Sequence, residues 1–151
     1  MPELEDLRRQ VDSLDQQIVH LLNKRAQLSV EIGKAKGGGS VYAPGREADV
    51  VDRLAGSAGP LPADALKAIY GEIMSSSRAL QAPLRVAFLG PEATFSHQAA
   101  LAHFGQSTKL LPVPTIPDVF KETEVGRADY GVVPIENSTE GPVTFSLDSF
   151  V

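Results

Sequence analysis

The sequence predicts a chain of two parts: an all-α helical module over residues 1–82, followed by an α/β lobe with a mainly parallel sheet over residues 84–151. Up to Pro83, apolar residues recur every three or four positions, which is the period of amphipathic helices. Beyond Pro83, short apolar runs alternate with helical segments, an order typical of parallel sheets. The charge divides in the same way, because the α/β lobe carries four basic and eight acidic residues and therefore −4 of the net −5.

Composition excludes several classes of protein. Hydrophobic residues make up 42% of the 151 residues and charged residues 22%, the balance of a soluble globular protein. The net charge of −5 argues against a broad basic face for nucleic acid, and no apolar run approaches the length of a membrane span. The absence of cysteine removes disulfides and thiolate ligands, and the acidic start differs from a signal peptide. We therefore expect a cytoplasmic protein without nucleic-acid or membrane partners.

The first predicted helix, residues 4–36, is long enough to need a partner. At about 1.5 Å per residue it extends roughly 50 Å, more than a small monomeric module can cover on one side. We therefore expect a homodimer through this helix. Arg25 interrupts its apolar face once. The apolar residues of that face, here called the long seam, are Leu4, Leu7, Val11, Leu14, Ile18, Leu21, Leu28 and Ile32.

Two shorter helices are predicted after the glycines at 37–39, which lose too much backbone entropy to continue the first helix. Pro44 fits the first turn of the second helix, which stops near Gly56. Pro62 opens the third helix and Pro83 closes it.

Polar residues accumulate where the three helices would meet. An arginine within an apolar seam is costly to bury without an anion, so Arg25 predicts a structural ion pair, a side chain that reaches solvent, or an anionic ligand. Lys36 falls near the same side of its helix. The second and third helices add Arg46, Glu47, Ser77 and Gln81. Several cations with few anions suit a small substrate that bears more than one carboxylate.

Arg8 predicts that the site is shared between two chains. It precedes Arg25 by 17 residues, so the two lie about 25 Å apart along one helix and cannot hold the same small ligand. An antiparallel partner chain would bring its own Arg8 beside Arg25. A dimer with two composite sites follows.

The spacing of these polar residues resembles the all-helical chorismate mutases over residues 4–82. The resemblance implies an intertwined dimer of three-helix chains that converts chorismate to prephenate without a metal or an organic cofactor. It also implies that Arg25 and the partner subunit's Arg8 hold the two carboxylates of chorismate. Arg46 and Ser77 would complete these contacts.

Three further positions take their roles from the same resemblance. Lys36 and Gln81 would donate hydrogen bonds to the ether oxygen of chorismate, and Glu47 would bind the ring hydroxyl. The rearrangement breaks a C–O bond ahead of C–C bond formation, so fixed donors at the ether oxygen stabilise the transition state. Ala43 stands where some members have an acid near the hydroxyl, which predicts weaker substrate affinity.

The α/β lobe is predicted from alternating strand and helix patterns. Strands are expected at residues 85–89, 109–113 and 130–135, separated by helices at 96–104 and 116–125. This order predicts a parallel sheet.

Two polar turns follow predicted strands, at the edge where open α/β sheets bind ligands. In residues 90–96, Thr94 or Ser96 can cap the next helix, whose free N–H groups can also face an anion. The second turn contributes Glu136, Asn137 and Ser138. Together these turns resemble prephenate dehydratase, and the order of the two parts resembles the bifunctional chorismate mutase-prephenate dehydratases of phenylalanine synthesis.

The dehydratase resemblance covers part of that family's pattern. The family has a second α/β lobe and a later threonine motif, so we expect half a prephenate site here and no conversion of prephenate to phenylpyruvate. His20, His97 and His103 do not cluster, so we expect no metal site. The alternative to an enzyme is a non-enzymatic helical dimerisation module with a small-molecule-binding or regulatory α/β fragment. Arg25 within the long seam favours the enzyme, because a pure dimerisation seam has no need of it.

Overall fold

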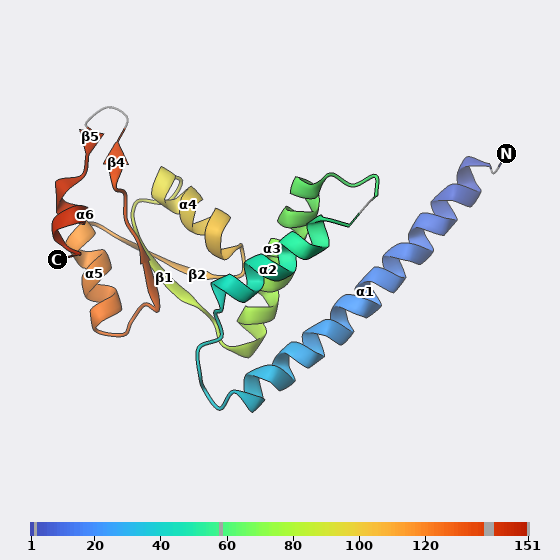
Figure 1. Cartoon of the computed structure of the whole chain (residues 1–151), viewed down its shortest axis with the longest axis horizontal. Helices are drawn as coiled ribbons and strands as arrows, with labels where there is room; N and C mark the ends of the chain where they lie inside the picture. The colour runs from blue at the N-terminus through green and yellow to red at the C-terminus, as the bar shows by residue number, and fades with distance from the viewer. Residues whose placement is uncertain (2, 58, 138–140, 151) are drawn as a thin grey trace.

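The computed structural model describes residues 1, 3–57, 59–137 and 141–150, the side chains of Asn137 and Phe145 excepted. A long helix extends from a body in which two further helices adjoin a small sheet with its own helices, and the two termini lie at opposite ends (Figure 1). The elements are α1 Leu4–Ala35, α2 Pro44–Ala55, α3 Ala63–Gln81, β1 Arg85–Leu89, α4 Phe95–Phe104, β2 Lys109–Val113, α5 Ile116–Glu124, β3 Tyr130–Val132, β4 Glu136–Asn137, β5 Gly141–Pro142 and α6 Thr144–Asp148. The predicted order of an all-α module and an α/β lobe is confirmed.

The helical module leaves most of α1 uncovered within one chain. The helix α3 packs against both α1 and α2, and the N-terminal half of α1 runs away from them (Figure 1). Ser29 is the one buried residue of α1, all of whose residues the structure describes. The residues of the long seam are 45% to 62% exposed. None of the helices in the described part of the chain combines the length and the hydrophobicity that a membrane span requires.

The α/β lobe is built on a parallel sheet with strand order β2-β1-β3. Side chains alternate between the two faces of the central strand. On the face that α4 covers, Val86 packs with Tyr42, Leu84 and Phe104, whereas Ala87 packs on the opposite face under α5. Tyr42 belongs to the connection between α1 and α2, so the helical module contributes a residue to the core of the lobe.

The predicted strand at 130–135 is too long. The strand β3 ends at Val132, and Glu136–Asn137 pairs antiparallel with Gly141–Pro142 in a separate ribbon. Pro134 explains the break, because proline has no N–H to donate to a ladder. The Pro134 carbonyl instead accepts a hydrogen bond of 2.6 Å from the Ser146 hydroxyl.

An ion pair joins the start of β1 to the start of β3. Arg85 donates from Nη2 to Asp129 Oδ1 at 2.9 Å, and its backbone N–H donates to Asp129 Oδ2 at 2.9 Å. The side-chain hydrogen bond from Arg85 lowers the pKa of Asp129.

Candidate active site

A cavity of about 510 Å³ lies between the three helices of the helical module. This volume is in the range of small-molecule sites. The sequence-predicted residues that line it are Arg25, Lys36, Arg46, Glu47, Ser77 and Gln81. Ala43 lines it too. The structure therefore brings these sequence-predicted side chains to one cavity.

Arg25 is held by neutral groups. Its Nη1 donates to the Ser77 hydroxyl at 2.5 Å, and its Nη2 lies 3.1 Å from the Met74 sulfur. No ion pair involves Arg25 within the part of the chain that the structure describes, so the structural ion pair considered from the sequence is not found there. Its positive charge is available to an anion that enters the cavity.

Gln81 lies at a close approach between α1 and α3. A Cβ atom at Gly33 would lie 2.9 Å from the Gln81 Cγ, so glycine at this position permits the approach. Gln81 Oε1 is buried without a hydrogen-bond partner among the described residues. A buried amide oxygen without a partner is costly, which indicates that a ligand or water completes this end of the cavity.

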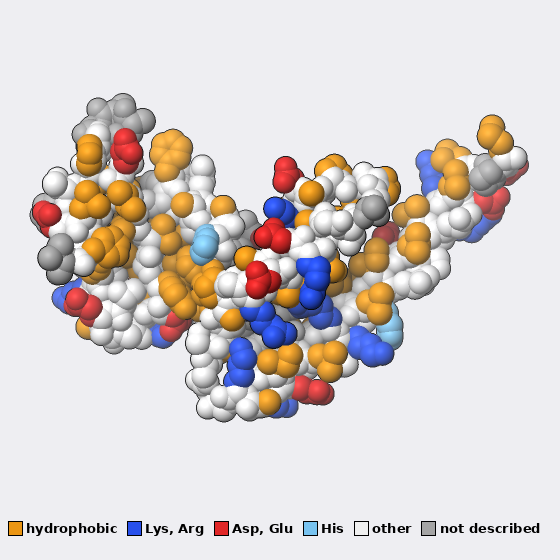
Figure 2. Space-filling view, viewed as in Figure 1, with side chains coloured by type: hydrophobic (Ala, Val, Ile, Leu, Met, Phe, Trp, Pro, Cys, Tyr) orange, Lys and Arg blue, Asp and Glu red, His pale blue; other side chains and the backbone are white. Residues whose placement is uncertain are grey.

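The charges around the cavity are mainly positive. Arg25, Lys36 and Arg46 line it together with Arg78, and Glu47 is the carboxylate among its lining residues. Glu47 forms an ion pair with Arg78, which neutralises it. Basic side chains gather on the face where α1 meets α2 (Figure 2). The excess of cations suits a ligand with more than one negative charge.

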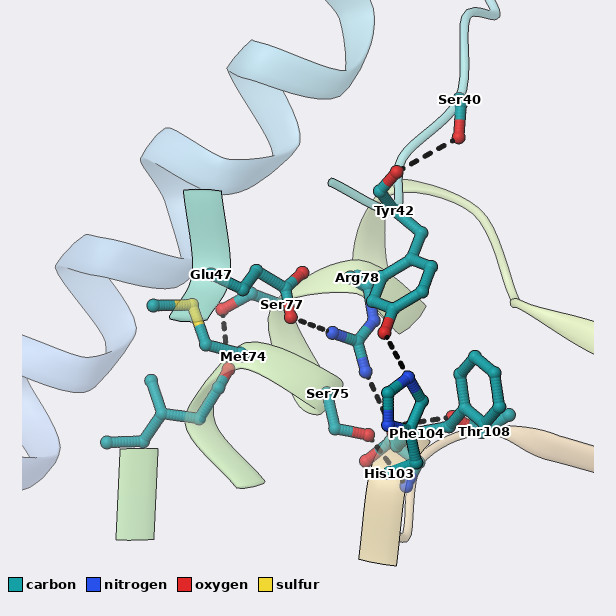
Figure 3. Close-up of polar contacts among 12 residues, drawn as sticks. Ser40, Tyr42, Glu47, Met74, Ser75, Ser77, Arg78, His103, Phe104 and Thr108 are labelled. Atoms are coloured by element: carbon teal, nitrogen blue, oxygen red, sulfur yellow. Dashed lines mark hydrogen bonds and ion pairs between the residues drawn. The ribbon is translucent and has the colours of Figure 1, made fainter. Parts of the chain in front are cut away.

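Arg78 and Tyr42 are cavity neighbours that the sequence did not indicate. Arg78 is 4% exposed and donates to the Phe104 carbonyl at 2.5 Å as well as to Glu47 (Figure 3). Its guanidinium carbon lies 4.9 Å from the centroid of the Tyr42 ring. Burial raises the pKa of the Tyr42 hydroxyl, against the opposite effect of the Arg78 charge. An arginine in the last turn of a helix is ordinarily solvated, so the sequence gave no reason to expect that Arg78 is buried.

Arg8 lies far from the cavity of its own chain. It is on the exposed N-terminal half of α1, where its Nη1 bonds Glu5 Oε1 at 2.7 Å. A role across a dimer stays a prediction.

The first turn of the α/β lobe is organised by Thr94. Its Oγ1 accepts a hydrogen bond of 3.3 Å from the His97 N–H and donates to the Pro91 carbonyl at 3.0 Å. Thr94, rather than Ser96, is therefore the residue that caps α4. Ser96 follows in the first turn and is half-buried.

The second turn lies at the same edge of the sheet as the first. The strands β1 and β3 are parallel neighbours, so the turns that follow their carboxyl ends share one edge (Figure 1). Glu136 is exposed in β4. The side chain of Asn137 and the whole of Ser138 lie outside the described residues.

His97 and His103 take part in packing, whereas His20 is exposed on α1. The His97 ring stacks on Phe88 with centroids 4.9 Å apart and accepts a hydrogen bond from the Ala93 N–H. His103 Nε2 lies 2.9 Å from the Tyr42 hydroxyl. No cluster of three or more metal-ligating side chains occurs in the described ranges.

Comparisons with known proteins match both parts. The family model of chorismate mutase type II matches residues 7–82, and that of prephenate dehydratase matches residues 86–151. Two proteins named bifunctional chorismate mutase/prephenate dehydratase are similar: the one from Aquifex aeolicus is 45% identical over 100% of this chain and 44% of its own length, and the one from Neisseria gonorrhoeae is 46% identical over 93% and 39%. The chain thus spans less than half the length of these relatives.

Among solved structures, a chorismate mutase from Helicobacter pylori in complex with prephenate is 33% identical over 52% of this chain and 88% of that one, with a TM-score of 0.49. The family match covers the three helices that enclose the cavity. The chain belongs to the chorismate mutase type II family, and a partial prephenate dehydratase domain follows the mutase domain.

Proposed function

We propose that the helical module is a chorismate mutase that converts chorismate to prephenate in phenylalanine biosynthesis, and that it acts as a homodimer. The observation that carries the proposal is the convergence of cationic and amide side chains from α1, α2 and α3 on one cavity, with the charge of Arg25 unpaired by any described carboxylate. The chorismate mutase type II match over residues 7–82 supports it. A cytoplasmic location stays a prediction from the sequence.

The chemistry requires placed donors rather than a nucleophile. In the rearrangement, negative charge grows on the ether oxygen as the C–O bond breaks, so donors fixed there bind the transition state more strongly than the substrate. Lys36 and Gln81 would supply these donors, and both line the cavity. Arg25 and Arg46 would hold carboxylates and so select the compact conformer in which the reacting carbons are close.

The dimer would complete each site. A single chain exposes the long seam along α1, and an exposed apolar face of this length marks a protein interface. An antiparallel partner would cover the seam, and the partner subunit's Arg8 would supply the second carboxylate contact.

We assign the α/β lobe to one side of a prephenate-binding region. Thr94, Ser96 and Glu136 belong to the turns at one edge of its sheet, together with Asn137 and Ser138 in the sequence. We expect the 151 residues by themselves not to convert prephenate to phenylpyruvate. The non-enzymatic alternative is less favoured, because a dimerisation seam does not explain why Arg25, without a carboxylate partner among the described residues, lines one cavity with Lys36 and Gln81.

Mixing two inactive variants tests the mutase and the shared site together. Arg8→Ala and Arg25→Ala should each lower the turnover of chorismate, followed by its ultraviolet absorbance, about 100-fold or more, because each removes a charged donor. After subunit exchange, an equal mixture should recover about a quarter of the wild-type rate, because half of the dimers are mixed and each mixed dimer has one intact site.

Arg9→Ala is the matched control, because Arg9 is an exposed neighbour that pairs with Asp6. It should keep wild-type activity. A wild-type chain that does not turn over chorismate would refute the mutase. A mixture that stays inactive after confirmed exchange would refute the role of Arg8 across the dimer.

A further inference from the structure

Arg78 is the one buried charged side chain among the described residues. Burying a guanidinium is costly unless its charge and its donors are matched. Two of its nitrogens are matched, Nη1 by the Glu47 carboxylate and Nη2 by the Phe104 carbonyl at 2.5 Å, whereas Nε is buried without a partner among the described residues. Glu47 lies on α2, whereas Phe104 is the last residue of α4 in the α/β lobe. One side chain of α3 therefore links the candidate mutase cavity to the other part of the chain (Figure 3).

The end of α4 is fixed against α3 by several contacts. The backbone N–H groups of Gln106 and Ser107 donate to the side chains of Glu72 and Ser75, each at 3.2 Å. A Cβ atom at Gly105 would lie 2.4 Å from the Ser75 Cβ, so only glycine permits this approach. The φ of Gly105 is +85°, which also favours glycine. The Phe104 carbonyl is thus held in a defined place relative to Arg78.

The contacts from α4 through Arg78 lead to Glu47, which lines the cavity. The Glu47 side chain is 21% exposed and lines the cavity, whereas the Arg78 side chain is 5% exposed. A carboxylate has two oxygens, so Glu47 can accept from Arg78 with Oε2 and keep Oε1 for a ligand hydroxyl. A side chain held at one oxygen by a buried cation has less rotational freedom than a solvated carboxylate.

We propose that the α/β lobe positions Glu47 in the mutase cavity through Arg78. The carbonyl at the end of α4 fixes Arg78, and Arg78 fixes Glu47. Arg78 is a positioning residue in this scheme, because it acts on the substrate through another side chain. The inference rests on the proposed mutase function and adds to it that the lobe supports the helical site.

A double-mutant cycle tests whether Arg78 acts through Glu47. Arg78→Met should lower kcat/KM for chorismate about tenfold or more in the wild-type background, but less than about twofold in a Glu47→Ala background, because the group it positions is then absent. Lys67→Met is the matched control, since Lys67 forms the other ion pair between α3 and α2, with Asp52 at 3.1 Å. It should leave kcat/KM within about twofold of wild type.

Equal losses from Arg78→Met in both backgrounds would overturn the proposal, because a merely structural role costs the same with or without Glu47. The wild-type assay separates this outcome from failure of the proposed function. A wild type without turnover refutes the mutase, whereas an active wild type with an additive cycle refutes the positioning.

A pair of glycine variants tests the contribution of the lobe without changing Arg78. Gly105→Ala should push the end of α4 from α3 and lower kcat/KM severalfold. Gly126→Ala is the control, because Gly126 also has a left-handed φ, +73°, but has open space around its Cβ position. Equal kcat/KM values for the two variants would overturn the proposal. This pair decides the matter if Arg78→Met does not fold.

Discussion

The helical module and the α/β lobe use their polar and apolar residues in opposite ways. In the helical module, the apolar seam of α1 is exposed, and polar side chains from three helices converge on a cavity. In the α/β lobe, Val86 and Phe88 are fully buried, and the polar Thr94 is bonded within its own turn. The lobe buries its core within one chain, with Tyr42 contributed by the helical module, whereas the helical module leaves its long seam exposed and its polar cavity open.

This difference between the two parts helps to distinguish polar residues with a structural role from polar residues that bind a ligand. A polar side chain that the fold satisfies locally has a structural explanation, as for the Thr94 cap. A buried polar atom without a hydrogen-bond partner among the described residues, such as Gln81 Oε1, has no such structural explanation. The cavity of the helical module is therefore the stronger functional assignment of the two.

The largest expected effect concerns the core of the α/β lobe, which is buried where the long seam of the helical module is exposed. Phe88→Ala should lower the free energy of unfolding of the α/β lobe by about 3 to 5 kcal/mol, because it removes a fully buried aromatic side chain and leaves a cavity. Tyrosine near-ultraviolet circular dichroism during urea unfolding would measure it, since Tyr42 belongs to a core cluster of the lobe and Tyr130 packs against that cluster.

Phe95→Ala makes the same chemical change at a side chain of the lobe that is 89% exposed. It should change the free energy of unfolding little. Similar losses in the two variants would show that the lobe does not close its core around β1.

The next effect tests whether the helical module needs a second chain. Leu14→Glu places a charge in the long seam and should give monomers that lose mutase activity about 100-fold or more, because each site then lacks its partner arginine. Gln16→Glu adds the same charge on the other side of α1 and should remain dimeric and active. Analytical ultracentrifugation and the chorismate assay would measure both. A Leu14→Glu chain that is active as a monomer would show that one chain completes its own site.

The sequence was a good guide wherever a repeating pattern or a turn residue determined the structure. The period of the seam predicted α1 to within one residue, and Pro44 and Pro62 marked the starts of α2 and α3. The strand at 130–135 was predicted too long, because its apolar character outweighed the effect of Pro134 on strand pairing.

The candidate site was predictable in part, for a physical reason. Arg25 interrupts an apolar pattern and could therefore be recognised as a candidate site residue. Helical spacing indicated that Lys36 and Gln81 lie on faces close to the same site. Arg78 was not visible, because its burial depends on the approach of α4 from a distant part of the sequence. The small side chains of Ser75, Ser76 and Ser77 before it were the available signal, since they allow another element to come close.

The smallest effect concerns Thr94, where structure and resemblance offer different roles. If its hydroxyl acts as the cap of α4, Thr94→Ala should lower the free energy of unfolding of the lobe by about 1 kcal/mol, and Thr94→Ser should restore most of it. Thr115 is the internal reference, because its Oγ1 caps α5 in the same way by accepting from the Asp118 N–H at 3.2 Å. Urea unfolding of Thr94→Ala and Thr115→Ala should therefore give losses of similar size. A neutral Thr94→Ala would mean that the cap contributes nothing to stability, and the hydroxyl would then be better explained by a ligand at the edge of the sheet.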